Sequence, residues 1–215
     1  MLNTLPFWNE LTQSQKDLFT RHSTTKKFEK NTPIYNILKG CVGLMLIKSG
    51  SIRVYMVSED GREITLYRLY PGDICILSAS CALNQITFDI SIDSVTDSEI
   101  IQIDAASFTK VLNENVYLEN FAYRMTTERF SDVMWAMQQI LFMSFDKRLA
   151  IFLIDEAVKT GSDDIKMTHE QIAKLMGSAR EVVSRMLKYF STEGLVELSR
   201  GGVKILDRGK LRELL

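Results

Sequence analysis

The chain is poor in the residues that bind metals or form disulfides. Its 215 residues include two histidines, His22 and His169, and three cysteines, Cys41, Cys75 and Cys81. Two histidines are too few for the His/Glu metal set of a cupin-type enzyme, and an odd number of cysteines is not typical of a secreted disulfide framework. We therefore expect a protein that is not an enzyme and that holds no metal and no cofactor.

The sequence also lacks the segments that direct a chain to or across a membrane. No uninterrupted apolar run reaches the roughly 18 residues that a membrane-spanning helix requires. The opening segment, MLNTLPFWNELTQSQKDLF, lacks the basic-then-apolar order of a signal peptide. These features predict a cytoplasmic protein without a membrane partner.

Net charge is small but unevenly distributed along the chain. The formal net charge is -1. Residues 1–145 carry 13 Lys and Arg against 16 Asp and Glu, whereas residues 165–215 carry 10 against 6, a net charge of +4. The C-terminal part is therefore the part that would attract a polyanion such as DNA.

Short strand-like runs fill residues 31–104. They alternate with Ser-Gly, Asp-Gly and Pro-Gly turn signals, as in VGLMLIKSG, SIRVYMVSEDG and REITLYRLYPGD. Such spacing is typical of a β-sandwich or jelly roll. In SIRVYMV, apolar Ile52 and Val54 alternate with Arg53, which predicts one buried and one partly solvated strand face. We assign residues 1–115 to an N-terminal β-roll.

Residues 105–160 contain no glycine and no proline, which predicts a helical stretch with a candidate break at Asn113 or Asn115 and a separate last helix that ends at Gly161. The long helix between them, residues 116–143, would be roughly 42 Å long at 1.5 Å per residue. A chain of this size could not cover such a helix, so we expect a second copy to cover it and assign residues 116–145 to dimerisation. The alternative is that the helix packs back on its own β-roll. The expected interface residues are Phe121, Met125, Val133, Met137, Ile140 and Leu141.

The segment MTHEQIAKLMGSAREVVSRMLKYF has the pattern of a helix-turn-helix. Thr168 and Gln171 form a Thr-x-x-Gln capping box that starts the first helix, and Gly177 supplies the turn before a second helix over residues 179–190. Beyond it, two short apolar runs flank Ser-Arg-Gly-Gly, as in a hairpin with a glycine turn. Together these elements predict a winged helix-turn-helix domain over residues 146–215.

Polar residues near the start of the second helix suit the base edges of the major groove. Arginine donates to guanine, glutamate accepts from cytosine, and serine contacts a base or a phosphate. The candidate base-reading residues are Arg180, Glu181, Ser184 and Arg185. The alternative is a solvated face on which Glu181 and Arg185 form an ion pair and Lys188 is merely exposed. The capping box, the glycine turn, the hairpin and the local positive charge favour double-stranded DNA as the partner.

The sequence resembles the Crp/Fnr family of bacterial transcription regulators over nearly its whole length. The resemblance rests on SGSIRV, EDGREITLYRLYPGD, FDKRLAIFLIDEA and, above all, THEQIAKLMGSAREVVSRMLK. It implies an α+β fold with an N-terminal β jelly roll like a cyclic-nucleotide-binding domain, a long dimerisation helix and a C-terminal winged helix-turn-helix. It also implies a homodimer controlled by a signal at the β-roll, with RNA polymerase as a further partner if the protein is an activator.

The resemblance also assigns roles to single residues. Arg180, Glu181 and Arg185 match the base-reading positions of the family, and Ser184 resembles the serine of the Ser-Arg pair in the Fnr branch. A palindromic site with a TGA core is therefore expected. Residues at the helix starts and one lysine would hold phosphates rather than bases: Thr168, Ser178 and Lys188.

The effector region departs from the pattern of the cyclic-AMP binders. These hold ribose and phosphate with a Gly-Glu and an Arg-Ser-Ala, whereas PGDICILSASCALNQITFDISI contains no Glu and no Arg. Val133 and Met134 stand where those proteins place a Thr-Ser pair against adenine. The iron–sulfur cluster of the oxygen-sensing branch needs four cysteines, and this chain has three. Neither cyclic AMP nor such a cluster is expected here.

Three possibilities stay open for the sensor. Cys75 and Cys81 could form a redox or electrophile sensor, or both could be small buried hydrophobes. The third possibility is a pocket for an uncharged or aromatic molecule, where Arg68 or Arg124 could meet a carboxylate. That pocket would be lined by residues such as Phe88, Tyr123 and Met134.

The competing function is a jelly-roll module that binds a ligand but not DNA, or an enzyme of that fold. The shortage of histidines argues against cupin-type catalysis. DNA binding can be told apart from both by its steep weakening as salt rises.

Overall fold

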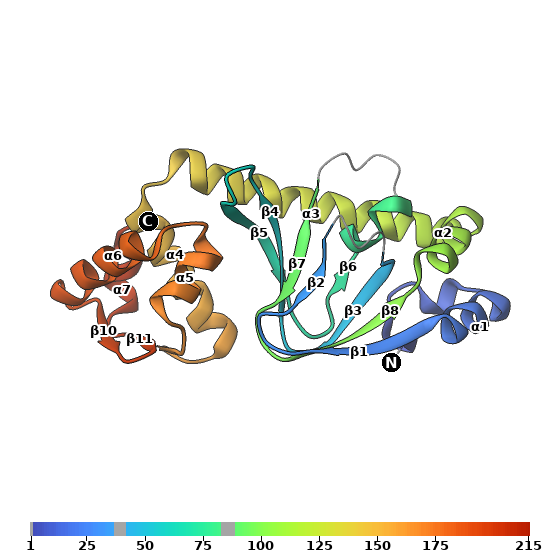
Figure 1. Ribbon diagram of the computed structural model, residues 1–215, viewed down its shortest axis with the longest axis horizontal. Coiled ribbons are helices and arrows are strands. Elements are labelled where there is room, and N and C mark those ends of the chain that lie inside the picture. Colours follow the sequence, from blue (N-terminus) through green and yellow to red (C-terminus); the bar gives the residue numbers. More distant parts are fainter. Residues whose placement is uncertain (1, 37–41, 83–88) are drawn as a thin grey trace. The chain divides into compact units, whose positions relative to one another are not determined.

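The computed structural model describes the backbone of residues 2–36, 42–82 and 89–215, and the side chains of the same residues except 80–82. The chain forms two compact units (Figure 1). The first unit comprises residues 1–57 and 66–134, and the second comprises residues 58–65 and 135–215. No described helix is both long and apolar enough to cross a membrane.

The first unit is built on two four-stranded sheets, in the orders β1-β8-β3-β6 and β2-β7-β4-β5 (Figure 1). The strand pairs whose register is described are antiparallel. Apolar side chains from both sheets form the core of this unit, which confirms the predicted β-roll. The strands are β1 (Ser23–Phe28), β2 (Pro33–Tyr35), β3 (Leu44–Ser49), β4 (Ile52–Val57), β5 (Glu63–Leu69), β6 (Ile74–Cys75), β7 (Ser91–Ser94) and β8 (Ser98–Ile103).

Helical segments precede, interrupt and follow these strands. Two of them, α1 and α2, begin where side chains satisfy free backbone N–H groups. Thr12 forms a capping box at the start of α1, and the Asp104 carboxylate accepts from the Ser107 N–H at 2.9 Å at the start of α2. The segments are η1 (Leu2–Thr4), η2 (Trp8–Glu10), α1 (Gln13–Arg21), η4 (Leu77–Ala82), α2 (Ala105–Glu114) and α3 (Val116–Phe142).

Asn115 separates α2 from the long helix α3. Its Oδ1 accepts hydrogen bonds from the backbone N–H groups of Tyr117 and Leu118 at 3.0 and 3.1 Å. Its Nδ2 donates to the Glu10 carbonyl at 3.0 Å. The side chain therefore caps α3 and ties the helix start to the N-terminal segment. This explains why the helical stretch, although free of glycine and proline, breaks at this point.

The two sides of α3 have different surroundings. Leu118 and Ala122 are buried, and other side chains on the same side are partly buried against the β-roll core: Phe121, Met125 and Val133. The Phe121 ring lies 4.9 Å from the Phe7 ring, centroid to centroid. Half of the residues predicted for a dimer interface thus contact their own protomer.

A second side of α3 is exposed and apolar. Tyr123, Phe130 and Met137 recur at every seventh position, and Met134 and Leu141 recur between them, which is the a and d spacing of a coiled coil. All five side chains are at least 44% exposed in the single chain. We call these five residues the α3 seam.

A buried ion pair joins β4 to β7. Arg53 lies opposite Asp93 in the strand register, and its Nε and Nη2 donate to the two carboxylate oxygens at 2.8 and 3.0 Å. The guanidinium also lies 4.0 Å from the Tyr55 ring centre. The Arg53 side chain is only 1% exposed, so the solvated face predicted for this position of β4 is wrong. The reason is that Asp93 neutralises the charge in place.

The second unit contains the helix-turn-helix and the hairpin beside it. A three-stranded sheet in the order β10-β11-β9 packs with the helices around one core, which confirms the predicted winged helix. The third strand, β9, and the last helix, α7, were not foreseen from the sequence. The elements are α4 (Phe145–Thr160), β9 (Asp164–Ile165), α5 (His169–Met176), α6 (Arg180–Thr192), β10 (Val196–Ser199), β11 (Gly202–Ile205) and α7 (Arg208–Glu213).

Removal of the acid from the buried ion pair should destabilise the first unit strongly. Asp93→Ala removes the carboxylate that neutralises the buried Arg53 charge, so we expect the free energy of unfolding to fall by about 3–5 kcal/mol. Urea denaturation of the full chain measures this change. Glu99→Ala, which removes the partner of Lys48 at the surface, is the control and should change stability little. Equal effects of the two substitutions would show that Arg53 does not depend on Asp93.

Candidate nucleic-acid interface

The start and the end of α5 are fixed by local hydrogen bonds. The Thr168 hydroxyl accepts from the Gln171 N–H at 3.2 Å, and the Gln171 Oε1 accepts from the Thr168 N–H at 2.9 Å. The predicted capping box is therefore present. At the other end, Gly177 adopts a left-handed backbone with φ of 61°, which favours glycine. The Ser178 N–H then donates to the Ala173 carbonyl at 3.0 Å, which closes the turn.

The helix α6 has one buried and one accessible side. Val183, Leu187 and Phe190 are fully buried and belong to one core with Ile172 and Ala173 of α5. On the other side, the candidate base-reading residues Arg180, Glu181 and Arg185 are exposed and Ser184 is half-buried. The structure therefore brings all four onto one accessible helix face. In the described part of the chain, no salt bridge joins Glu181 to Arg185.

The three candidate phosphate contacts lie around this face. Thr168 and Lys188 are exposed, and Ser178 is half-buried in the turn between α5 and α6. The Thr168 hydroxyl accepts the capping hydrogen bond and keeps its own proton available for a phosphate oxygen. Their contact with DNA stays a prediction.

One contact within this face was missed by the sequence analysis. The His169 Nδ1 lies 2.9 Å from the Ser184 Oγ, which joins the first residue of α5 to the middle of α6. Burial lowers the pKa of His169, and the nearby positive charge of Arg180 lowers it further. The ring is therefore neutral at pH 7. Residues fifteen positions apart give no local pattern that would have revealed this pair.

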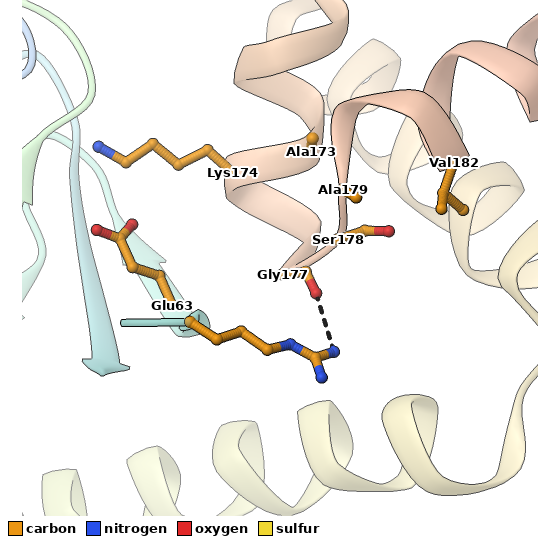
Figure 2. Close-up of a pocket in the computed structure, with 8 residues that line it drawn as sticks. Glu63, Ala173, Lys174, Gly177, Ser178, Ala179 and Val182 are labelled. Carbon is orange, nitrogen blue, oxygen red and sulfur yellow. Dashed lines mark hydrogen bonds between the residues drawn. The ribbon is translucent and has the colours of Figure 1, made fainter. Parts of the chain in front are cut away.

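Two arginines donate to the carbonyl groups at the end of α5. The Arg148 Nη2 on α4 donates to the Met176 carbonyl at 2.8 Å, and the Arg62 Nη2 donates to the Gly177 carbonyl at 3.3 Å (Figure 2). Cationic donors are favourable at a helix C-terminus, where carbonyls have no partner within the helix. Burial lowers the pKa of Arg148, and the charge of Arg62 adds to this. These two hydrogen bonds stabilise the turn between α5 and α6. The sequence analysis assigned no role to either arginine.

A pocket of about 530 Å³ lies beside this turn (Figure 2). Residues 58–65, which belong to the second unit, form one of its walls. The Thr65 hydroxyl donates to the Lys174 carbonyl at 3.4 Å, and a Cβ at position 177 would lie 3.2 Å from the Glu63 carbonyl oxygen. Both the backbone conformation and this close approach favour glycine at 177. The lining residues are Arg62, Glu63, Ala173, Lys174, Gly177, Ser178, Ala179 and Val182.

The candidate sensor residues do not gather in one place in the single chain. Cys75 is buried, with 1% of its surface exposed, whereas Tyr123 and Met134 lie on the exposed α3 seam. The side chain of Cys81 and the whole of Phe88 lie outside the described residues. No group of three or more potential metal ligands is present among the residues described.

Two polar groups near Cys75 are buried without hydrogen-bond partners among the described residues: the Tyr67 hydroxyl and the Arg129 Nε. The Arg129 Nη1 donates to Asp132 at 2.7 Å, and the guanidinium lies 5.2 Å from the Tyr67 ring centre. Burial, followed by the effect of Cys75, raises the pKa of Tyr67 well above its usual value. An unmade hydrogen bond of this kind costs about 1–3 kcal/mol. These two donors between α3 and β5 were also missed from the sequence.

Comparison with known proteins gives one consistent result. Residues 147–214 match the Crp-like helix-turn-helix domain, and residues 25–115 match the cyclic nucleotide-binding domain. A solved structure from Eubacterium rectale, assigned to the crp/fnr family of transcriptional regulators, is 44% identical, covers 99% of this chain and 98% of its own, and superposes with a TM-score of 0.93. The Cyclic AMP receptor protein of Thermus thermophilus is 23% identical over 97% of this chain and 96% of its own length. The Nitrogen fixation regulation protein FixK of Bradyrhizobium diazoefficiens is 25% identical over 85% of this chain and 74% of its own length.

The buried thiol of Cys75 should resist alkylation in the folded protein. Burial raises the pKa of Cys75, so the thiol stays protonated at pH 7, and the thiolate is the reactive form. We expect iodoacetamide to modify Cys75 far more slowly in the native chain than in the same chain unfolded in urea. Peptide mass spectrometry follows this one residue in both states. Equal rates of alkylation in the two states would mean that Cys75 is accessible and reactive in the folded protein, as a sensor thiol would be.

Proposed function

Because the chain belongs to the Crp/Fnr family of DNA-binding transcription regulators, we propose that it works as a homodimer which reads a palindromic DNA site with α6 and responds to an effector at the β-roll. Regulators of this family act on DNA and are not enzymes. A bacterial regulator of this kind works in the cytoplasm, where the DNA is. RNA polymerase becomes a further partner if the protein activates transcription.

The accessible face of α6 is the observation that carries this proposal. Arg180, Glu181 and Arg185 are exposed there, while the opposite face is anchored in the core. A helix held in this way can enter the major groove, where arginine pairs with guanine O6 and N7 and glutamate accepts from cytosine N4. We therefore retain a half-site with a TGA core.

Contacts with the DNA backbone would complete the interface. The +4 charge of residues 165–215 attracts the phosphates at any sequence. Thr168, Ser178 and Lys188 lie around the base-reading face and would set its register on the duplex without reading sequence.

The α3 seam supports the proposed dimer. Its five residues, Tyr123, Phe130, Met134, Met137 and Leu141, are apolar and exposed at coiled-coil spacing. Of the interface residues expected from the sequence, Met137 and Leu141 belong to this seam and Ile140 lies next to it. Phe121, Met125 and Val133 instead contact their own β-roll. The helix would then serve both the dimer and its own core.

The effector would bind where the β-roll meets α3. The Tyr67 hydroxyl and the Arg129 Nε are two buried donors there without a partner among the described residues, so a ligand with acceptor oxygens would supply hydrogen bonds to both. The segment from residue 71 to 92 contains neither Glu nor Arg, which argues against cyclic AMP. The burial of Cys75 argues against a redox signal at that thiol.

Selection from a random DNA pool with the purified protein tests the function, and Arg185 provides the sharpest variant. We expect a TGA-containing palindrome to be enriched, and the binding to weaken steeply with salt. Arg185→Ala should lose about 1–3 kcal/mol on that site and relax the preference at one base pair.

Arg21→Ala is the matched control, because it removes an exposed arginine from α1 in the first unit. It should leave both affinity and preference unchanged. An equal loss on all sequences for Arg185→Ala would show a phosphate contact, and no enrichment by the wild type with or without candidate effectors would contradict DNA recognition.

A charge on the seam should separate the protomers. Met137→Glu would bring two like charges together across the dimer axis, and we expect the dissociation constant of the dimer to rise by roughly a hundredfold or more. Sedimentation velocity measures the change. Gln138→Glu adds the same charge at the neighbouring exposed position, off the seam, and should leave the dimer intact. An unchanged sedimentation coefficient for Met137→Glu would contradict the α3 interface.

A further inference from the structure

The contact between His169 and Ser184 lies within the base-reading face and has no role in the function proposed above. We propose that His169 is a positioning residue that fixes the direction of the Ser184 hydroxyl, so that Ser184 reads a base by accepting a hydrogen bond. This inference rests on the proposed reading of DNA by α6 and adds a determinant of its sequence specificity.

Among the residues that the structure describes, His169 is the one hydrogen-bond partner of the Ser184 side chain. The distance of 2.9 Å between the His169 Nδ1 and the Ser184 Oγ is that of a good hydrogen bond. Both residues are half-buried, which limits the competition from water. Each residue lies on a helix that is itself anchored, because Ile172 of α5 and Val183 of α6 are fully buried in one core. The contact is therefore held by the packing of the two helices.

The protonation state of the ring decides which atom donates. Arg180 on α6 is the charge that acts on the ring, while Glu170, the next residue on α5, is exposed. Together with burial, Arg180 keeps the imidazole neutral, with one nitrogen protonated and the other an acceptor. We assign the proton to Nε2, the intrinsically favoured position for a neutral histidine side chain. With this assignment Nδ1 accepts the hydrogen bond and the Ser184 hydroxyl donates it.

A consequence for base recognition follows from this direction. A hydroxyl whose proton is directed to Nδ1 offers only lone pairs to a third group. In the major groove it can then pair with the amino groups of adenine N6 or cytosine N4, and not with guanine O6, thymine O4 or N7 atoms. Without the imidazole, the hydroxyl rotates and accepts or donates equally well. His169 would thus make Ser184 discriminate between bases that its hydroxyl would otherwise contact equally well.

Base-pair substitutions across the selected half-site, combined with a double-mutant cycle, test this proposal. Ser184→Ala identifies the base pair that Ser184 reads, and we expect the discrimination there to fall roughly three- to tenfold, as for one hydrogen bond. His169→Leu should cause the same loss at the same base pair. The double variant should lose no more than either single variant, because both remove one interaction.

A conservative variant separates positioning from a structural role. His169→Asn places an amide oxygen close to the position of Nδ1 and should keep most of the discrimination that His169→Leu loses. Glu170→Gln, a change at the neighbouring exposed residue of α5, is the control and should leave the base preference unchanged. A thermal melt of each variant shows whether the domain remains folded.

Several results would overturn the inference. An equal loss of affinity on all sequences for His169→Leu would indicate a phosphate contact instead. Additive losses in the double variant would show that the two residues act independently. The inference would also fail if Ser184→Ala affected no base pair, or affected one that presents only acceptors. Failure of the wild type to enrich any sequence is a different result, and it would overturn the proposed DNA reading itself.

Discussion

The burial of Val183, Leu187 and Phe190 on one side of α6 is the constraint on which the DNA-reading face depends. These side chains share a core with α4, α5 and the three-stranded sheet, so α6 cannot rotate about its axis without exposing apolar surface. The polar face is therefore fixed in direction. This is how an apolar core, which contacts no DNA, determines which side chains would reach the base edges.

The turn between α5 and α6 is the second point at which this arrangement is held. Its backbone conformation favours glycine at 177, and Arg148 and Arg62 donate to the carbonyl groups around it. Residues 58–65 therefore take part in the second unit through Arg62.

Two arginines of the first unit, the buried Arg53 on β4 and the partly buried Arg129 on α3, differ in how their donors are used. Both oxygens of Asp93 accept from Arg53, and such a pair holds two strands in register. The Arg129 Nη1 donates to Asp132, while its Nε has no hydrogen-bond partner among the described residues. The first arrangement is what a stable core needs. The second carries a cost in the free protein, and a binding site can recover that cost when its ligand arrives.

The sequence by itself determined the order of the elements, because periodicity and turn residues act locally. The capping box at Thr168, the glycine turn at 177 and the helical stretch free of glycine and proline all lie in the structure as expected. Only the tertiary structure decided which residues that are far apart in the sequence come into contact. Arg53 is buried because Asp93 lies opposite it on another strand. Phe121 and Met125 pack against the β-roll core, and His169 contacts Ser184. Such contacts depend on how two elements pack against each other, and no local pattern in either element records the identity of its partner.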